Sequence, residues 1–171
     1  MSPRTPLPGA ASVSASSPLT VAELAARITA LPGVAEQVVD EASGLPESVL
    51  GSRFYFVGSG RTLPFATIVL RDVPGFDEES HLDRDGVWRL NVQLGRDRFE
   101  TQFGYPPRRL ADHRSAVDFA AADRVVPHPA YGAQGWCAVV CPSRRSLPQL
   151  MELLTHAAAK AAERAARHED R

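Results

Sequence analysis

The segment of residues 123–142 holds the side chains best suited to chemistry in this chain. His128 stands between Pro127 and Pro129, and the two prolines restrict the backbone on either side of it. A histidine in a rigid loop can act as a general acid or base, or it can contact a ligand. The alternative is a rigid connection into a strand, with the imidazole hydrogen-bonded to a nearby backbone group.

Three side chains that follow His128 could line a pocket with it. Tyr131, Gln134 and Trp136 combine two aromatic rings with one amide, a set that is typical of small-molecule sites. The alternative is that Trp136 belongs to the hydrophobic core and that Tyr131 covers its edge.

A second group of polar side chains lies on a strand predicted at residues 86–94. Apolar residues alternate there with Arg89, Asn91 and Gln93, so the three polar side chains share one side of the strand. We predict that this side is wet, either as bulk surface or as the floor of a groove. Arg89 could bind a carboxylate or phosphate there, or it could pair with an acid from residues 72–85.

Residues 71–85 carry six acidic side chains. Their spacing does not match that of a calcium-binding loop, so we predict a solvated loop rather than a cation site. The five histidines also lack the spacing of metal ligands: His81, His113, His128, His156 and His168. We therefore expect no metal site and no cofactor.

The chain has no recognisable catalytic or phosphate-binding motif. Ser59 lies between two glycines but lacks the pattern of a hydrolase nucleophile, and the same segment lacks the end of a phosphate loop. Cys137 and Cys141 lie four residues apart in a predicted strand, which puts their Cα atoms about 13 Å apart. A disulfide needs less than about 7 Å, so we predict free thiols and a cytoplasmic location.

Composition limits the class of protein. The chain has 171 residues, 44% of them hydrophobic, which is enough for one domain with a core. The net charge of −1 argues against nucleic acid as a partner, and no segment is apolar for long enough to cross a membrane. We predict a disordered tail at residues 1–18, rich in Pro, Ser and Ala, and a single domain at residues 19–168.

The order of predicted elements indicates an α+β fold. A capping box at Thr20 begins the first helix, Ser146 begins the long last helix, and residues 96–103 form a short helix. Residues 105–115 are predicted as a basic loop and residues 116–122 as a helical turn. Strands are predicted at residues 34–39, 52–57, 65–70, 86–94 and 135–140. We predict a curved antiparallel sheet of about four to six strands, packed with the N-terminal and C-terminal helices.

Residues 65–69, 82–91 and 127–136 resemble an uncharacterised actinobacterial family, one of the numbered domains of unknown function, over about residues 20–165. More distantly, the layout is similar to that of the MmcQ/YjbR-like proteins. Those proteins share the Arg89-Leu90-Asn91 strand with a short helix after it, a His-containing loop, the Trp136 strand and a C-terminal helix. The resemblance implies a compact α+β fold with a curved sheet. DNA-binding modules have been compared with that fold, but this chain lacks the lysine-bearing basic pattern around its tryptophan strand.

Three functions are consistent with these features. The first is a non-enzymatic module that binds a small organic or anionic ligand, or a partner protein, beside residues 127–136. The second is an enzyme that uses His128 as general acid or base, with Tyr131 or Arg89 as an electrophilic helper. The third is nucleic-acid binding, which requires five arginines to form one patch: Arg108, Arg109, Arg114, Arg144 and Arg145. We favour the first, because no complete catalytic constellation is present.

Overall fold

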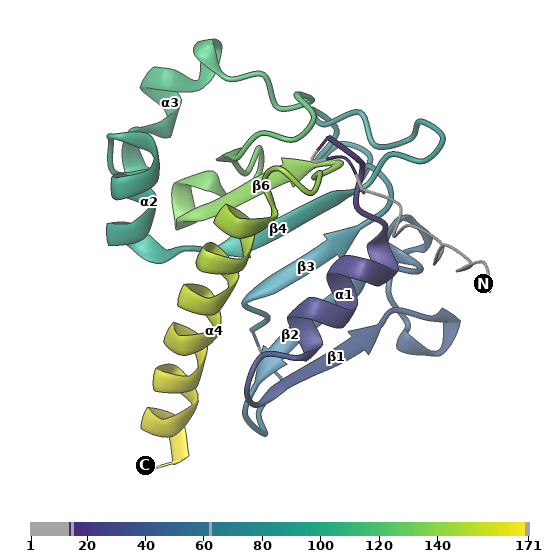
Figure 1. Ribbon diagram of the computed structural model, residues 1–171, viewed down its shortest axis with the longest axis vertical. Helices are drawn as coiled ribbons and strands as arrows, with labels where there is room; N and C mark the ends of the chain where they lie inside the picture. Colours follow the sequence, from purple (N-terminus) through teal and green to yellow (C-terminus); the bar gives the residue numbers. More distant parts are fainter. Residues whose placement is uncertain (1–13, 15, 62, 170–171) are drawn as a thin grey trace, which may run out of the picture.

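The structure is a computed structural model that describes residue 14, residues 16–61 and residues 63–169. Most of the predicted disordered tail, residues 1–13 and 15, lies outside the described residues. Six strands form one sheet in the order β1-β2-β3-β4-β6-β5, and every neighbouring pair is antiparallel. The strands are β1 (Val34–Val38), β2 (Arg53–Val57), β3 (Ala66–Val69), β4 (Arg89–Gln93), β5 (Val126–Pro127) and β6 (Trp136–Val140). This confirms the predicted α+β fold with a curved antiparallel sheet (Figure 1).

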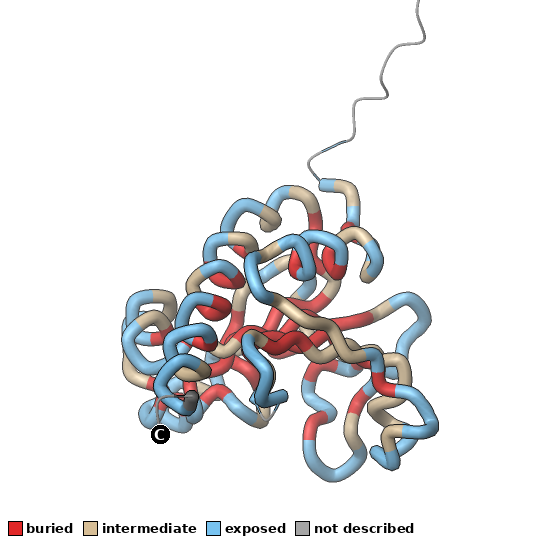
Figure 2. The backbone as a smooth tube through the Cα atoms, turned by 90° about the horizontal axis from the view of Figure 1, so that it is seen from below, coloured by how far each residue is buried: buried red, intermediate tan, exposed pale blue. Residues whose placement is uncertain are grey.

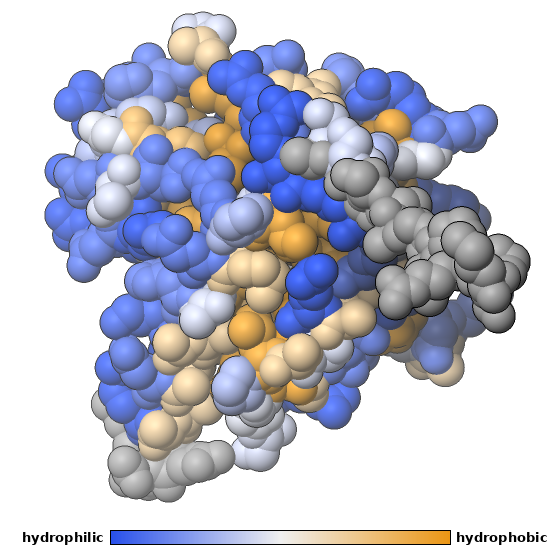
Figure 3. Space-filling view, in the orientation of Figure 1, coloured by the Kyte–Doolittle hydropathy of each residue, from blue (hydrophilic) through white to orange (hydrophobic). Residues whose placement is uncertain are grey.

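Two helices cover one face of the sheet, α1 (Val21–Thr29) and α4 (Leu147–Glu169) (Figure 1). The predicted capping box begins α1: the Thr20 hydroxyl accepts the Glu23 N–H, and the Glu23 carboxylate accepts the Thr20 N–H. Apolar side chains gather between α1 and α4, whereas hydrophilic side chains cover most of the rest of this face (Figure 3). The helices and strands share one core, which includes Leu24, Ile28, Ile68, Leu90, Val92, Val139, Leu150 and Leu153.

Loops cover the opposite face. Figure 2 shows the buried strands between the helices and this layer of loops. The layer includes residues 71–88, called the cover segment below, and residues 117–135. A small apolar cluster of Phe119, Val126 and Ala138 packs on the β5–β6 side of it. The side chains of β3 and β4 that point away from the helices therefore lie under loops.

The segment after α2 (Gly95–Phe103) differs from the prediction. Residues 105–115 are not a loop but three short helical turns: Pro107–Arg109, α3 (Leu110–His113) and Arg114–Ala116. The prediction was wrong because Pro106 and Pro107 were interpreted only as the end of a helix, although proline is equally suited to the first turn of the next one. The helical turn predicted at residues 116–122 is also wrong, since Val117 is already extended (φ −100°, ψ 123°).

Gly135 fixes the path of the chain into β6. Its φ is +85°, and a Cβ atom placed there would lie 3.0 Å from the carbonyl carbon of Gly95. We expect Gly135→Ala to lower the free energy of unfolding by about 2 to 3 kcal/mol, because it combines backbone strain with a clash against main chain that cannot move aside. Urea denaturation measures the change.

Gly104 supplies the control for Gly135. Its φ is +82°, but a Cβ atom there would meet nothing within 4 Å. Gly104→Ala should therefore cost only the backbone strain, about 1 kcal/mol. Equal losses in the two variants would show that the approach of Gly95 to Gly135 is unimportant.

Candidate functional site

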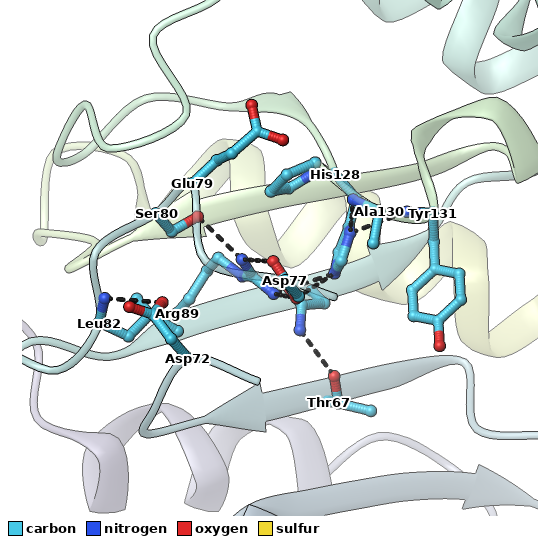
Figure 4. A network of polar contacts seen from close by, with 12 residues as sticks. Thr67, Asp72, Asp77, Glu79, Ser80, Leu82, Arg89, His128, Ala130 and Tyr131 are labelled. Atoms are coloured by element: carbon cyan, nitrogen blue, oxygen red, sulfur yellow. Dashed lines mark hydrogen bonds and ion pairs between the residues drawn. The ribbon is translucent and has the colours of Figure 1, made fainter. Parts of the chain in front are cut away.

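Arg89 of β4 is the centre of the polar structure beneath the cover segment. Its side chain is 1% exposed, and its guanidinium donates hydrogen bonds in three directions (Figure 4). Nε donates to Asn91 Oδ1 at 2.7 Å, and Nη1 donates to Ser80 Oγ at 2.8 Å. Two parallel bonds join Nη1 and Nη2 to the Asp77 carboxylate, at 3.0 and 2.5 Å. This two-bond pairing is the strongest geometry available to arginine and a carboxylate.

Of the two forms predicted for this side of β4, bulk surface is wrong for Arg89 and Asn91. Both are buried, because the cover segment turns Asp77 and Ser80 toward them, and both line the sheet side of a cavity. The prediction of a solvated acidic loop was wrong for Asp72 and Asp77, which are buried, whereas the other four acids are exposed. Of the two roles considered for Arg89, the pairing with an acid of this loop is the one that forms.

Both members of the buried pair are charged. Burial alone would raise the pKa of Asp77, but the hydrogen bonds and charge of Arg89, helped by His128, outweigh it and hold that pKa below its usual value. The carboxylate therefore stays ionised beside the guanidinium. The charges of Asp77 and Arg89 cancel, so the group of side chains around Arg89 is neutral as a whole.

His128 completes this group, and its side chain is 2% exposed. Nδ1 accepts the backbone N–H groups of Ala130 and Tyr131, both at 3.0 Å. Nε2 lies 3.0 Å from Arg89 Nη2 and 3.7 Å from Asp77 Oδ2. Burial, with a smaller contribution from the charge of Arg89, lowers the pKa of His128 to about 3, although Asp77 opposes the shift. The imidazole is therefore neutral at neutral pH, and a base with so low a pKa is poorly suited to acid–base catalysis there.

A cavity of about 560 Å³ lies above these polar side chains. Arg89, Asn91 and Thr67 are on its sheet side, where Asn91 Nδ2 donates to Thr67 Oγ1 at 2.9 Å. Phe76 and Tyr131 are 56% and 44% exposed, and their rings lie edge to face with centroids 5.5 Å apart. Most of the remaining lining is apolar and includes Val49, Phe54, Leu63, Pro64, Val69, Val73 and Trp136.

The six residues singled out from the sequence all line this cavity: Arg89, Asn91, His128, Tyr131, Gln134 and Trp136. The Tyr131 ring centroid is 5.1 Å from that of His128 and 6.4 Å from that of Trp136. Trp136 is only 9% exposed, so it also contributes to the core, as the alternative interpretation held. His128 is hydrogen-bonded to the backbone, as the alternative interpretation held, and it also contacts Arg89.

Sequence reasoning missed Asp77 and Ser80, which bind Arg89, and Phe76 at the cavity opening. Asp77 was only one of six acids in a segment without periodicity. Thr67 could have been identified from the sequence, because it is the one polar residue in the apolar strand at residues 65–70. In the structure it points to the same face as Asn91.

The arginines considered for nucleic-acid binding are mostly engaged with acids. Carboxylates pair with Arg109 (Asp112, 2.6 Å), Arg114 (Glu79), Arg144 (Glu23) and Arg145 (Asp123, 3.9 Å). Each pair places a negative charge where a phosphate would have to bind. This arrangement is unfavourable for a continuous basic surface.

Other predicted features can be placed directly. Cys137 and Cys141 are free thiols, as predicted, and burial raises the pKa of Cys137 to about 12. Within the described residues, no three His, Cys, Asp or Glu side chains are grouped so that they could hold a metal ion. In the same part of the chain, none of the helices has the length and apolar character needed to cross a membrane.

Comparison with known proteins identifies a family. A family model described as a family of unknown function, DUF6194, matches residues 19–170. Searches of curated proteins and of solved structures found no match. The actinobacterial origin and the likeness to MmcQ/YjbR-like proteins therefore stay predictions from the sequence. The family match covers well over half of the sequence, and the chain belongs to the family of unknown function DUF6194.

Proposed function

We propose that this protein is a binding module for a small, largely apolar organic molecule, which it holds in the cavity between the sheet and the loops. The observation that carries the proposal is the cavity itself, with its apolar walls and a few polar groups gathered on one side. Small-molecule sites have this composition, because apolar walls supply affinity and a few fixed polar groups supply orientation.

The charges around the cavity favour a neutral ligand over the anionic one considered from the sequence. Arg89 is the one basic side chain other than histidine in the lining, and both terminal nitrogens of its guanidinium bind Asp77. A carboxylate or phosphate would have to displace Asp77 or lie beside its negative charge. Either arrangement costs more than the binding of an uncharged molecule.

The enzyme alternative has one favourable observation: His128 and Arg89 converge within 3.0 Å. The state of His128 argues against this alternative. Its Nδ1 is occupied by two backbone N–H groups, and its low pKa keeps the ring neutral at neutral pH. A base that is so weak transfers protons poorly near pH 7. Binding without catalysis is therefore the function that the geometry supports best.

Thermal shift across a panel of small apolar molecules tests the proposal, with the binding site mapped by NMR on hits. We expect hits to perturb Trp136 and Tyr131, and we expect Leu63→Asp to weaken their binding about tenfold. Leu63 is a half-exposed part of the cavity lining, so the change replaces apolar contact with a charge and need not disturb the fold.

Leu45→Asp is the matched control. Leu45 is 44% exposed, similar to Leu63 at 50%, but it is not part of the cavity lining. The control should bind every hit as the unmodified protein does. The proposal would be contradicted if no member of the panel raised the melting temperature, or if the two variants weakened binding equally.

A further inference from the structure

The hydrogen bonds of His128 determine where its single ring proton lies. A neutral imidazole has one N–H and one acceptor nitrogen. Nδ1 accepts backbone N–H groups from both Ala130 and Tyr131 at 3.0 Å, so it carries the lone pair. The proton must therefore be on Nε2. The opposite tautomer would set Nδ1–H against two backbone N–H groups at once.

This tautomer leaves two donors facing each other. His128 Nε2–H lies 3.0 Å from Arg89 Nη2, which carries only N–H groups and cannot accept a hydrogen bond. One N–H of Arg89 Nη2 is satisfied by Asp77 Oδ2, which is also the nearest carboxylate oxygen to His128 Nε2, at 3.7 Å. The second N–H of Nη2 and the N–H of Nε2 are therefore short of an acceptor. Buried donors without an acceptor are costly and rare.

Both donors belong to side chains that line the cavity, although each side chain is at least 98% buried. An oxygen atom in the cavity that lay within hydrogen-bonding distance of both nitrogens would satisfy both N–H groups. Asn91, the neighbouring polar side chain on the sheet side, already donates to Thr67 and accepts from Arg89. The unsatisfied pair, one member of which is charged, is therefore a point of attachment for an acceptor atom of a ligand in the cavity.

We propose that His128 Nε2–H and Arg89 Nη2–H together recognise the carbonyl oxygen of a neutral, largely apolar ligand. This inference rests on the proposed binding function and names the class of molecule bound. A carbonyl oxygen has two lone pairs and can accept from both donors. A carboxylate would also accept from them, but it would put a second negative charge next to Asp77. A hydrocarbon of the same shape would leave both donors unsatisfied.

Three matched probes test the inference: 2-acetylnaphthalene, which has a neutral carbonyl group, 2-ethylnaphthalene, which lacks it, and 2-naphthoate, which is an anion. Calorimetry gives the affinities, and NMR mapping shows whether each probe contacts the cavity. We expect 2-acetylnaphthalene to bind about tenfold or more tightly than each of the other two, since one of its new hydrogen bonds comes from a charged donor.

Two substitutions distinguish the role of His128 Nδ1 as an acceptor from the role of Nε2 as a donor. In His128→Asn, the amide oxygen can take the place of Nδ1 and accept from the loop, but no donor remains at the position of Nε2. In His128→Gln, the amide nitrogen can take the place of Nε2, but the acceptor for Ala130 and Tyr131 is lost. We expect the preference for 2-acetylnaphthalene over 2-ethylnaphthalene to disappear in the first variant and to persist in the second.

The tautomer is measured directly on the unmodified protein by ¹⁵N NMR of the His128 ring, so the test does not depend on the stability of a variant. A proton on Nδ1 would overturn the inference. Equal affinity for all three probes, or tightest binding of 2-naphthoate, would also overturn it, while the proposed binding function would stand. If none of the probes perturbed the cavity, the inference would be overturned, and the binding function would be overturned with it only if the wider panel also gave no hit.

Discussion

Arg89→Met is expected to lower the free energy of unfolding by about 3 to 5 kcal/mol, which would leave little of the stability of a domain of this size. The substitution fills similar space, but it leaves the buried carboxylate of Asp77 without its partner. It also removes the donors to Ser80 and Asn91. Chemical denaturation followed by the fluorescence of Trp88 and Trp136 measures the loss.

Two further variants identify the cause of that loss. In the double variant Arg89→Met with Asp77→Leu, no charge is left buried, so we expect about 2 kcal/mol or more to be recovered relative to Arg89→Met. Arg53→Met removes an arginine from a half-buried pair with Glu36 (3.0 Å) and should cost about 1 kcal/mol or less. A double variant no more stable than Arg89→Met would show that the unpaired charge is not the cause.

Acidification should produce an effect of similar size through His128. Its pKa is about 3 in the folded protein and 6.5 in an ordinary environment, so below pH 6.5 the unfolded chain binds a proton that the folded protein does not. This contribution to stability is complete above pH 6.5 and is lost as the pH falls toward 3, at about 1.4 kcal/mol per pH unit. Asp77 adds a further loss at lower pH, because its pKa is held below 3.8 and its stabilising charge disappears as the pH falls through that lowered pKa.

His128→Asn isolates this effect, because asparagine does not titrate. In denaturation curves measured from pH 7 to pH 4, the stability of the unmodified protein below pH 6.5 should fall more steeply than that of the variant, by up to about 1.4 kcal/mol per pH unit. The same substitution at His113, which is exposed, controls for the loss of an imidazole as such. Parallel curves for the unmodified protein and His128→Asn would contradict the low pKa.

The helices and most strands could be predicted because their signals are local. The capping box at Thr20 and the apolar period of α4 depend on residues within one or two helical turns. The alternation along residues 86–94 likewise assigned Arg89 and Asn91 to one face of β4. The two-residue strand β5 was missed, since Pro127 has no N–H group and nothing in its own sequence marks it as paired.

The sequence did not predict that the cover segment buries the polar face of β4. That burial depends on which acid of the segment pairs with Arg89. Six acidic residues in the cover segment were equivalent by type, and only the fold shows that Asp77 points inward while Glu78 and Glu79 are exposed. The same reasoning explains His128: the prolines predicted a rigid loop, but not that its ring would be buried between the backbone and Arg89. Local sequence identified six of the residues that line the cavity, and long-range contacts determine the protonation of His128 and Asp77.

The polar group beneath the cover segment also has a consequence for the order of folding. Asp77 and His128 lie 12 and 39 residues from Arg89 along the chain, and Arg89 takes its final position only when β4 is paired with both β3 and β6. The contacts of Asp77 repay the cost of closing its loop only once Arg89 is in place. We therefore expect the segment that carries Asp77 to dock late, onto a sheet that is already formed. Substitutions that weaken the contacts of this segment with Arg89 should speed unfolding far more than they slow folding.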